Sequence, residues 1–243
     1  MKDVIVIGAG AAGLTAAREF RQAGKSVQIL EASDRIGGRV RSISDPHAGI
    51  PLELGAEFLH GEAKESNKLL REARLATVPV LGEHYRSRNG KFESQDKVWN
   101  RMARVFKRMD DDRKQDRSFQ DFLDTKPGGP LYKEERELAL GFVQGFNGAD
   151  AWRISERSLA EQGNPTEGAA KSARILNGYG ALIDFIATDL VDVIQFNSVV
   201  NRILWDESRV SVFTRDGTQF DARTCVITIP LPHLQDESLA IES

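Results

Sequence analysis

Three glycines near the start of the chain have the spacing of a loop that binds phosphate groups. They form the pattern GxGxxG directly after the apolar run Val4–Ile7. In this pattern the first glycine allows a tight turn, the second lets the main chain approach a pyrophosphate, and the third lets a helix pack closely on a strand. Free N–H groups at the start of that helix bind phosphate without a lysine. The pattern therefore predicts a phosphate site made by Gly8, Gly10, Ala11, Ala12 and Gly13.

A carboxylate follows at the distance expected of a ribose-binding residue. Glu31 directly follows the apolar segment 26–30 and stands 18 residues after Gly13. A spacing of about 20 is typical of the acid that accepts the ribose hydroxyls. An acid here disfavours a 2′-phosphate, so NADP is the poorer candidate. A lone GxGxxG is a weak signal, but with the acid it favours a dinucleotide site over a purely structural turn.

The elements that must position these residues are a strand, a helix and a second strand. The run Val4–Ile7 is apolar and β-branched throughout, which is typical of a parallel strand covered on both faces. Helical spacing continues from Leu14 to Gly24, a natural helix stop. Segment 26–30 supplies the second strand, so the chain begins with the elements of a nucleotide-binding unit.

A second glycine segment separates FAD from NAD. The run EASDRIGGRVRS at 31–42 resembles the second glycine motif of the glutathione-reductase-like FAD fold, in the subgroup of amine oxidases, protoporphyrinogen oxidases and carotene desaturases. The resemblance implies non-covalent FAD, with Gly37 and Gly38 bringing main chain to the pyrophosphate and Arg39 offering a planar cation. It also places Ala32 and Arg35 at the cofactor. An NAD-dependent dehydrogenase is disfavoured because it leaves this segment unexplained.

The segment LELGAEFLHG at 52–61 extends the resemblance. It is similar to the family segment whose main chain lies beside the flavin ring and whose end faces the substrate. This implies cofactor contacts from Leu54, Gly55, Ala56 and Glu57. His60 becomes the substrate-facing candidate, against the plainer interpretation of a structural, hydrogen-bonding histidine. No other catalytic residue is assigned.

The last third of the chain resembles the return of the family into its FAD domain. Residues 177–182 resemble a glycine turn that starts a helix, and residues 193–203 resemble a strand pair in which Val200 places its main chain against adenine. Residues 210–220 predict a hairpin by apolar alternation. Segment 225–230 resembles a last buried strand, in which Cys225 is interpreted as a small buried residue and not as a covalent flavin anchor.

The middle of the chain has more charge and helical spacing. Val98, Met102 and Val105 fall on one face of a helix whose other face is basic. Aspartates follow that helix, which favours a solvated face over contact with a membrane. Ser118 and Asp121 have the spacing of a helix N-cap.

Together these segments predict an α/β fold with two parts. A Rossmann-like FAD-binding domain, with a βαβ unit and a parallel sheet extended by a β-meander, is expected from residues 1–78 and 171–243. A mainly helical, substrate-binding insertion is expected from residues 79–170.

Composition excludes several other classes. The chain has 243 residues and a formal net charge of −3, which argues against a nucleic-acid partner. Its single cysteine rules out an internal disulfide, and the four histidines lie far apart, so no metal site is expected. No apolar run is long enough to cross a membrane, and no signal segment precedes the first strand. A cytoplasmic location and no membrane partner are therefore expected.

The resemblance implies oxidation of a small-molecule amine. A hydride would pass from the α-carbon to the flavin, and dioxygen would reoxidise the flavin to give hydrogen peroxide. The chain stops before the family's lysine near the flavin, its aromatic substrate residues and its C-terminal flavin-binding segment. Two alternatives stay open: a truncated, non-catalytic FAD-binding or interaction protein, and a flavoprotein like the protoporphyrinogen oxidases or carotene desaturases. Exposed apolar surface is expected where the missing part would pack, with self-association or a partner chain there.

Overall fold

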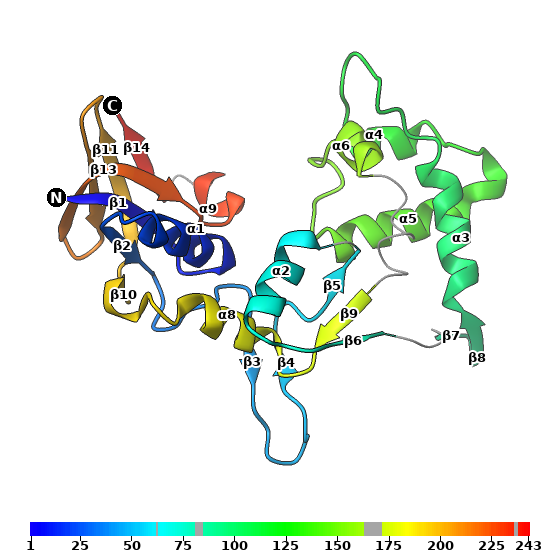
Figure 1. The fold of residues 1–243 in the computed structure, drawn as a ribbon. Coiled ribbons are helices and arrows are strands. Elements are labelled where there is room, and N and C mark those ends of the chain that lie inside the picture. Colours follow the sequence, from blue (N-terminus) through cyan, green and yellow to red (C-terminus); the bar gives the residue numbers. More distant parts are fainter. Residues whose placement is uncertain (62, 81–84, 163–171, 236–237) are drawn as a thin grey trace. The chain divides into compact units, whose positions relative to one another are not determined.

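The computed structural model describes residues 1–61, 63–80, 85–162, 172–235 and 238–243. The chain forms two compact units, whose elements Figure 1 shows. The sheet unit consists of Met1–Leu59, Ala63–Val78 and Arg174–Ser243, and the helical unit consists of His60–Glu62 and Pro79–Ala173. The predicted domain boundary between residues 170 and 171 lies outside the described residues.

A seven-stranded sheet forms the centre of the sheet unit, in the strand order β10, β2, β1, β13, β12, β11, β14. The bounds are β1 Lys2–Ile7, β2 Val27–Leu30, β10 Ile194–Gln195, β11 Val200–Trp205, β12 Val210–Thr214, β13 Gln219–Ile227 and β14 Ala240–Glu242. Neighbours from β10 to β13 are parallel, whereas β13, β12 and β11 run antiparallel as a meander. In Figure 1 the blue β1 accordingly lies beside the red-orange β13. This topology confirms the predicted α/β fold with a parallel sheet and an added β-meander.

Burial on both faces explains why residues Val4–Ile7 of β1 are all apolar. Ile5 and Val6 have no exposed surface, and Ile5 is paired with Cys225 of β13. Strand β13 pairs antiparallel with β12 through its first half and parallel with β1 through the rest. It therefore connects the meander to the parallel part of the sheet.

Helices α1 (Ala11–Gln22) and α8 (Tyr179–Ala187) complete the core of the sheet unit. Leu14 of α1 is fully buried, and Arg18 of α1 lies 4.8 Å from the ring centre of Phe185 in α8. Just after α1, Gly24 has a φ angle of +73°, which confirms the predicted helix stop.

The other elements of the sheet unit, and those at the passages between the two units, are short. In the sheet unit they are β3 Ser42–Ile43, β4 Leu52–Glu53, α2 Lys64–Glu72, η2 Val191–Val193 and α9 Leu231–Gln235. Strands β3 and β4 form an antiparallel pair. The chain passes from one unit to the other within or beside β5 Leu59–His60, β6 Thr77–Pro79 and β9 Ser172–Ile175.

The helical unit has its own aromatic core. Its helices are α3 Gln95–Phe106, α4 Phe119–Asp124, η1 Pro130–Tyr132, α5 Lys133–Phe146 and α6 Glu156–Glu161. Met102 and Val105 of α3 are buried against Phe119 of α4 and Val143 of α5, which confirms the predicted apolar face. Ser118 and Asp121 form a capping box at the start of α4, as predicted.

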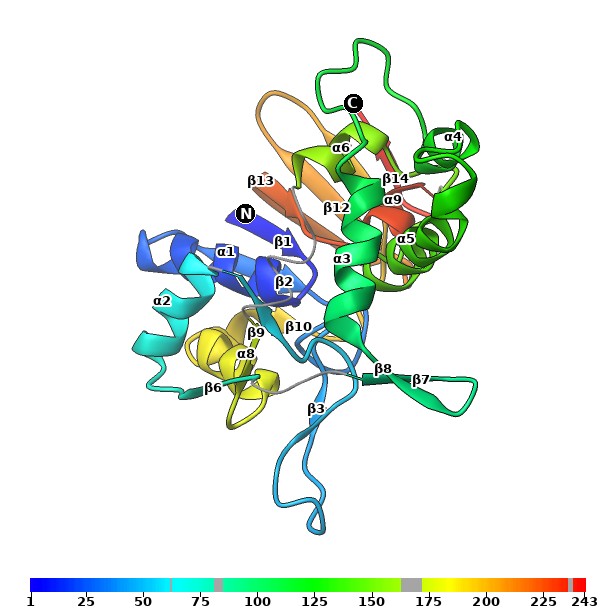
Figure 2. The ribbon, with the colours of Figure 1, turned by 90° about the vertical axis from the view of Figure 1, so that its right-hand side faces the viewer.

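One element of the helical unit was not predicted. Strands β7 (Tyr85–Arg88) and β8 (Lys91–Ser94) form a hairpin, which Figure 2 shows running into the start of α3. Its turn residues Asn89 and Gly90 have φ angles of +50° and +74°. Asn-Gly favours this turn, so a local signal was present within residues 79–170, which were expected to be mainly helical.

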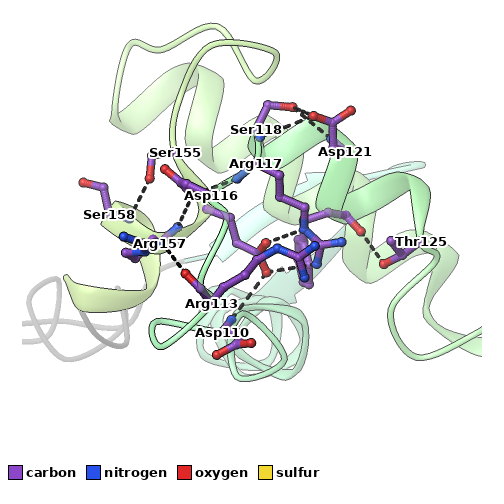
Figure 3. Close-up of polar contacts among 12 residues, drawn as sticks. Asp110, Arg113, Asp116, Arg117, Ser118, Asp121, Thr125, Ser155, Arg157 and Ser158 are labelled. Carbon is purple, nitrogen blue, oxygen red and sulfur yellow. Dashed lines mark hydrogen bonds and ion pairs between the residues drawn. The ribbon is translucent and has the colours of Figure 1, made fainter.

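Polar side chains hold the loop before α4 to the start of α6 (Figure 3). Arg117 forms an ion pair with Glu156, whose carboxylate is fully buried. Asp116 accepts hydrogen bonds from Ser155 and from the Arg157 main chain, and the bond from Ser155 contributes most to lowering the pKa of Asp116. This network is structural, since it joins two segments about 40 residues apart.

Candidate cofactor-binding site

A cleft of about 1170 Å³ opens at the carboxyl ends of the parallel strands in the sheet unit. Ile7, Leu30 and Thr228, which end or follow β1, β2 and β13, contribute to its wall. Ligands bind at this end of parallel sheets because the connecting loops diverge there. The predicted residues that line the cleft are Gly8, Gly10, Ala11, Ala12, Glu31, Ala32, Arg35, Gly37, Gly38, Arg39, Leu54, Gly55, Ala56 and Val200. The structure thus brings together predicted residues from both ends of the chain, from Gly8 to Val200.

Gly13 supports the first loop from outside the cleft. A Cβ atom on this residue would lie 1.9 Å from the carbonyl oxygen of Gly8, so only glycine lets α1 start so close to β1. Helix α1 has no side-chain N-cap. The first N–H groups of a helix have no partner within it, and Ala11 and Ala12 at this end line the cleft.

Glu31 is buried between the loops that follow β1 and β2, with 8% of its surface exposed. Oε2 accepts a hydrogen bond from the Ala9 N–H at 2.7 Å, and Oε1 accepts from the N–H and hydroxyl of Ser33 at 2.9 and 2.7 Å. A carboxylate accepts about four hydrogen bonds, so one acceptor position is left for a ligand hydroxyl. The same side chain also fixes Ala9, the residue between the first two glycines of the loop.

The second glycine loop is bound to the first. The Gly37 N–H donates to the Ala9 carbonyl at 2.8 Å. Arg35 does not extend freely into the cleft: its guanidinium donates to the carbonyls of Ile36, Gly38 and Val40 at 3.0, 2.8 and 3.2 Å. Arg35 therefore shapes this loop, a function that the sequence did not reveal.

Three further arginines contribute positive charge to the cleft. Arg39, Arg41 and Arg215 line it, and all three residues are exposed. Their guanidinium groups form no hydrogen bond or ion pair with any residue that the structure describes. They are therefore the cations that can meet an anionic ligand, and guanidinium groups match phosphate oxygens well.

Sequence reasoning missed about half of the lining. The unpredicted residues include Arg41, Ser198, Val199, Arg215, Thr228, Ile229, Pro230, His233, Ser238 and Leu239. The Thr228 hydroxyl donates to the Ile7 carbonyl at 2.8 Å and so fixes the start of the glycine loop. Strand β13 ends at Ile227, and knowing that it pairs with β1 would have indicated Thr228. Arg215 lies in a hairpin turn and carries no comparable signal.

Besides Gly13, two predicted residues do not line the cleft. Glu57 forms an ion pair with Arg174 at 2.5 Å. His60 belongs to the helical unit, where Nδ1 lies 3.1 Å from the Ser172 hydroxyl and the ring packs edge-on against Phe146. The roles assigned to Glu57 at the flavin and to His60 at the substrate stay predictions.

Cys225 packs against the core of the sheet unit and is not among the residues that line the cleft. Burial raises the pKa of its thiol from 9.0 to about 12. Among the described residues, no group of three or more His, Cys, Asp or Glu side chains is placed to hold a metal ion. In the same part of the chain, every helix is too short or too polar to cross a membrane.

A glycine loop after β1, an acid after β2 and a cleft at the carboxyl ends of the strands define a dinucleotide-binding protein of Rossmann type. A family model described as flavin-containing amine oxidoreductase matches residues 11–242. The chain therefore belongs to the family of flavin-containing amine oxidoreductases. This confirms the predicted family and FAD as its cofactor.

Individual proteins support the same assignment. Polyamine oxidase 4 of rice (Oryza sativa subsp. japonica) is 29% identical over 267 residues, which cover 99% of this chain and 53% of the rice protein. Human lysine-specific histone demethylase 2 is 27% identical over 256 residues, which cover 96% of this chain and 30% of the human protein. Cyclohexylamine oxidase from Brevibacterium oxydans IH-35A has the same fold, with a TM-score of 0.79 at 22% identity. The match covers 99% of this chain and 60% of the oxidase chain. The chain thus spans about half the length of the rice relative.

Proposed function

We propose that the sheet unit binds FAD non-covalently in the cleft and that the protein takes part in oxidising a small-molecule amine. The observation that carries this proposal is the convergence of two linked glycine loops, the Glu31 carboxylate and three arginines on one cleft. The family description and the rice relative, named a polyamine oxidase, support an amine as substrate.

The residues present fit this cofactor. Gly10 pairs with Gly37 in a β-bridge, and a Cβ atom on Gly38 would lie 3.5 Å from the Gly10 Cα. The linked loops present no side chain at Gly10 and Gly38, so main chain can approach a pyrophosphate. In the proposed arrangement the N–H groups of Ala11 and Ala12 and the guanidinium of Arg39 hold the pyrophosphate. Glu31 holds the ribose with its remaining acceptor position.

The two ends of the cofactor are proposed to lie against the remaining walls of the cleft. The main chain of Val200 is proposed to lie against adenine, and Leu54, Gly55 and Ala56 against the flavin ring. When bound, the flavin supplies a two-electron acceptor for an amine C–H bond, with dioxygen proposed as its reoxidant. The protein's part is to orient the cofactor and the amine and to exclude water, and His60 of the helical unit is the proposed substrate-facing residue.

Two alternative functions are compatible with the same fold and would replace the oxidation of amines. A porphyrinogen or carotenoid oxidase would share the cleft but differ in the helical unit, and a non-catalytic FAD-binding protein would keep only the cleft. Self-association or a partner chain remains a further proposal, motivated by the exposed Leu231, Leu234 and Ile241 of the sheet unit.

Titration of the purified chain with FAD tests the proposal. Absorbance bands of bound flavin that bleach when a polyamine is added without oxygen are the expected result. Bound flavin that is not reduced by any amine would leave FAD binding standing and refute amine oxidation by this chain. Absence of FAD binding would refute the proposal as a whole.

Replacing Glu31 tests the cleft directly. Glu31→Ala removes the ribose acceptor and leaves the Ala9 N–H without its partner, so Kd should rise about tenfold or more for both FAD and ADP. Glu207→Gln is the matched control, because Glu207 is exposed in the turn between β11 and β12. Equal Kd values for Glu31→Ala and the parent chain would contradict the assignment.

A further inference from the structure

The start of helix α8 is held by side chains that come from far away in the sequence. Gly178 is its N-cap residue and offers no side chain. Instead Glu53 Oε1 accepts a hydrogen bond from the Tyr179 N–H at 2.6 Å, and the Ser42 hydroxyl accepts one from the Gly180 N–H at 2.7 Å. A carboxylate at this end also matches the partial positive charge of a helix N-terminus.

The two capping side chains are bound to each other. The Ser42 hydroxyl donates to Glu53 Oε2 at 2.5 Å, so its proton and one of its lone pairs are both in use. Glu53 in turn accepts with both oxygens. We call Ser42, Glu53 and the two N–H groups the α8 clamp.

The glycines of the segment make room for the clamp. A Cβ atom on Gly178 would lie 2.9 Å from Pro51 and 3.2 Å from Glu53 Oε1, and the φ angle of Gly178 is +85°. A Cβ atom on Gly180 would lie 3.0 Å from the Ser42 hydroxyl oxygen. Glycine at both positions therefore leaves room for Pro51, Glu53 and Ser42 beside the turn.

The clamp is attached to one wall of the cleft. Ser42 follows Arg41, and Glu53 precedes Leu54; both neighbours line the cleft. The Leu54 N–H donates to the Arg41 carbonyl at 2.7 Å, and the Ala56 N–H donates to the Arg39 carbonyl at 3.1 Å. The wall is thus two segments joined to each other and, through the clamp, to α8.

As far as the structure describes the chain, the side-chain hydrogen bonds of Ser42 and Glu53 do not extend to the other end of the cleft. The carboxylate of Glu31 and its partners Ala9 and Ser33 belong to the loops after β1 and β2. Ser42 and Glu53 instead bond to each other and to the start of α8. The second glycine loop, although bonded to Ala56 through Arg39, has its own links in the Gly37 N–H on the Ala9 carbonyl and the Val40 N–H on the Gly37 carbonyl. A change in the clamp should therefore move segment 54–56 more than the loops that hold the adenosine and the pyrophosphate.

We infer that Glu53 and Ser42 are positioning residues that hold segment 54–56 against the flavin end of the cofactor. This inference rests on the proposed FAD site and names two residues that the reaction depends on without contact to the reacting atoms. The inference predicts a selective effect on binding. Loss of the clamp weakens the binding of FAD, which occupies the whole cleft, but not the binding of ADP, which lacks the flavin end.

The test compares Kd for FAD and for ADP in Glu53→Ala, Glu53→Gln and Ser42→Ala, with Glu207→Gln as control. For Glu53→Ala the Kd of FAD should rise about tenfold or more, while that of ADP stays within about twofold. Glu53→Gln keeps an acceptor for Tyr179 but offers an N–H in place of one oxygen, so its effect should be smaller. Ser42→Ala removes a single hydroxyl and is the variant least prone to unfolding.

Hydrogen exchange of the same variants supplies a second measurement. The amides of Tyr179 and Gly180 should exchange faster in Glu53→Ala and Ser42→Ala, respectively, because each loses its acceptor. Equal weakening of FAD and ADP, or unchanged FAD affinity in all three variants, would overturn the inference. A parent chain that binds neither ligand would instead refute the proposed FAD site itself.

Discussion

The absence of a side chain at Gly13 lets helix α1 begin against the end of strand β1. A Cβ atom here would meet main chain, the Gly8 carbonyl at 1.9 Å, so it cannot be accommodated by rotating a side chain. Gly8 and Gly10 in the same loop line the cleft. A residue outside the cleft therefore controls the geometry of the residues that form it.

Gly13→Ala should lower the free energy of unfolding by about 3 kcal/mol or more, because the helix must move away from the strand. Gly141→Ala is the control, since Gly141 lies within helix α5 and a Cβ atom there meets nothing within 4 Å. That change should raise stability by up to about 1 kcal/mol. Urea denaturation of both variants measures the difference, and equal effects would contradict the close approach at Gly13.

At the scale of elements, a buried ion pair joins the loop before α4 to helix α6 in the helical unit. The carboxylate of Glu156 is fully buried, whereas 21% of the Arg117 side chain is exposed. The hydrogen bond with Glu156 is the main cause that raises the pKa of Arg117. Removing the arginine would leave a buried carboxylate without its partner, which is far more costly than losing an exposed pair.

Arg117→Ala is therefore expected to destabilise the helical unit by about 3–5 kcal/mol. Arg21→Ala is a matched control: Arg21 also binds a carboxylate with two nitrogens, Asp192 at 2.7 and 3.1 Å, but both side chains are exposed. Its cost should be about 0–1 kcal/mol. Thermal unfolding of both variants checks the ranking, and a similar loss for the two would show that burial of Glu156 does not matter.

At the scale of the whole molecule, the proposed cofactor should stabilise one unit selectively. All residues that line the cleft belong to the sheet unit. A ligand that binds only the folded state stabilises it by about 2.7 kcal/mol at about 100 times its Kd. Saturating FAD should therefore slow hydrogen exchange in β1, β2 and β13, and much less in the core of α3 and α5.

Hydrogen exchange followed by mass spectrometry measures this distribution. Protection confined to the sheet unit supports the cleft as the site. Protection that is strongest in α3 and α5 would place the ligand elsewhere, and ADP serves as a control that should protect the loops after β1 and β2 without segment 54–56.

Much of the cleft was predictable because its chemistry is local in sequence. The first strand, the glycine loop, helix α1 and Glu31 lie within 31 consecutive residues, and their geometry follows from strand pairing and close packing of neighbours. The predicted meander follows from alternation and a turn in residues 210–220. The hairpin at Asn89 and Gly90 had an equally local signal, but it lies in the range 79–170 that was expected to be mainly helical.

The sequence by itself determined the family, the FAD cofactor, the parallel sheet and the phosphate-binding loops, because glycine spacing and apolar runs act on adjacent residues. Only the tertiary structure decided which distant side chains support them. Arg35 folds back onto its own loop, Thr228 closes the loop of β1, and Glu53 with Ser42 caps a helix about 130 residues further on. A single carboxylate or hydroxyl carries no mark of its partner in the sequence, since the partner is set by how the sheet and helices pack.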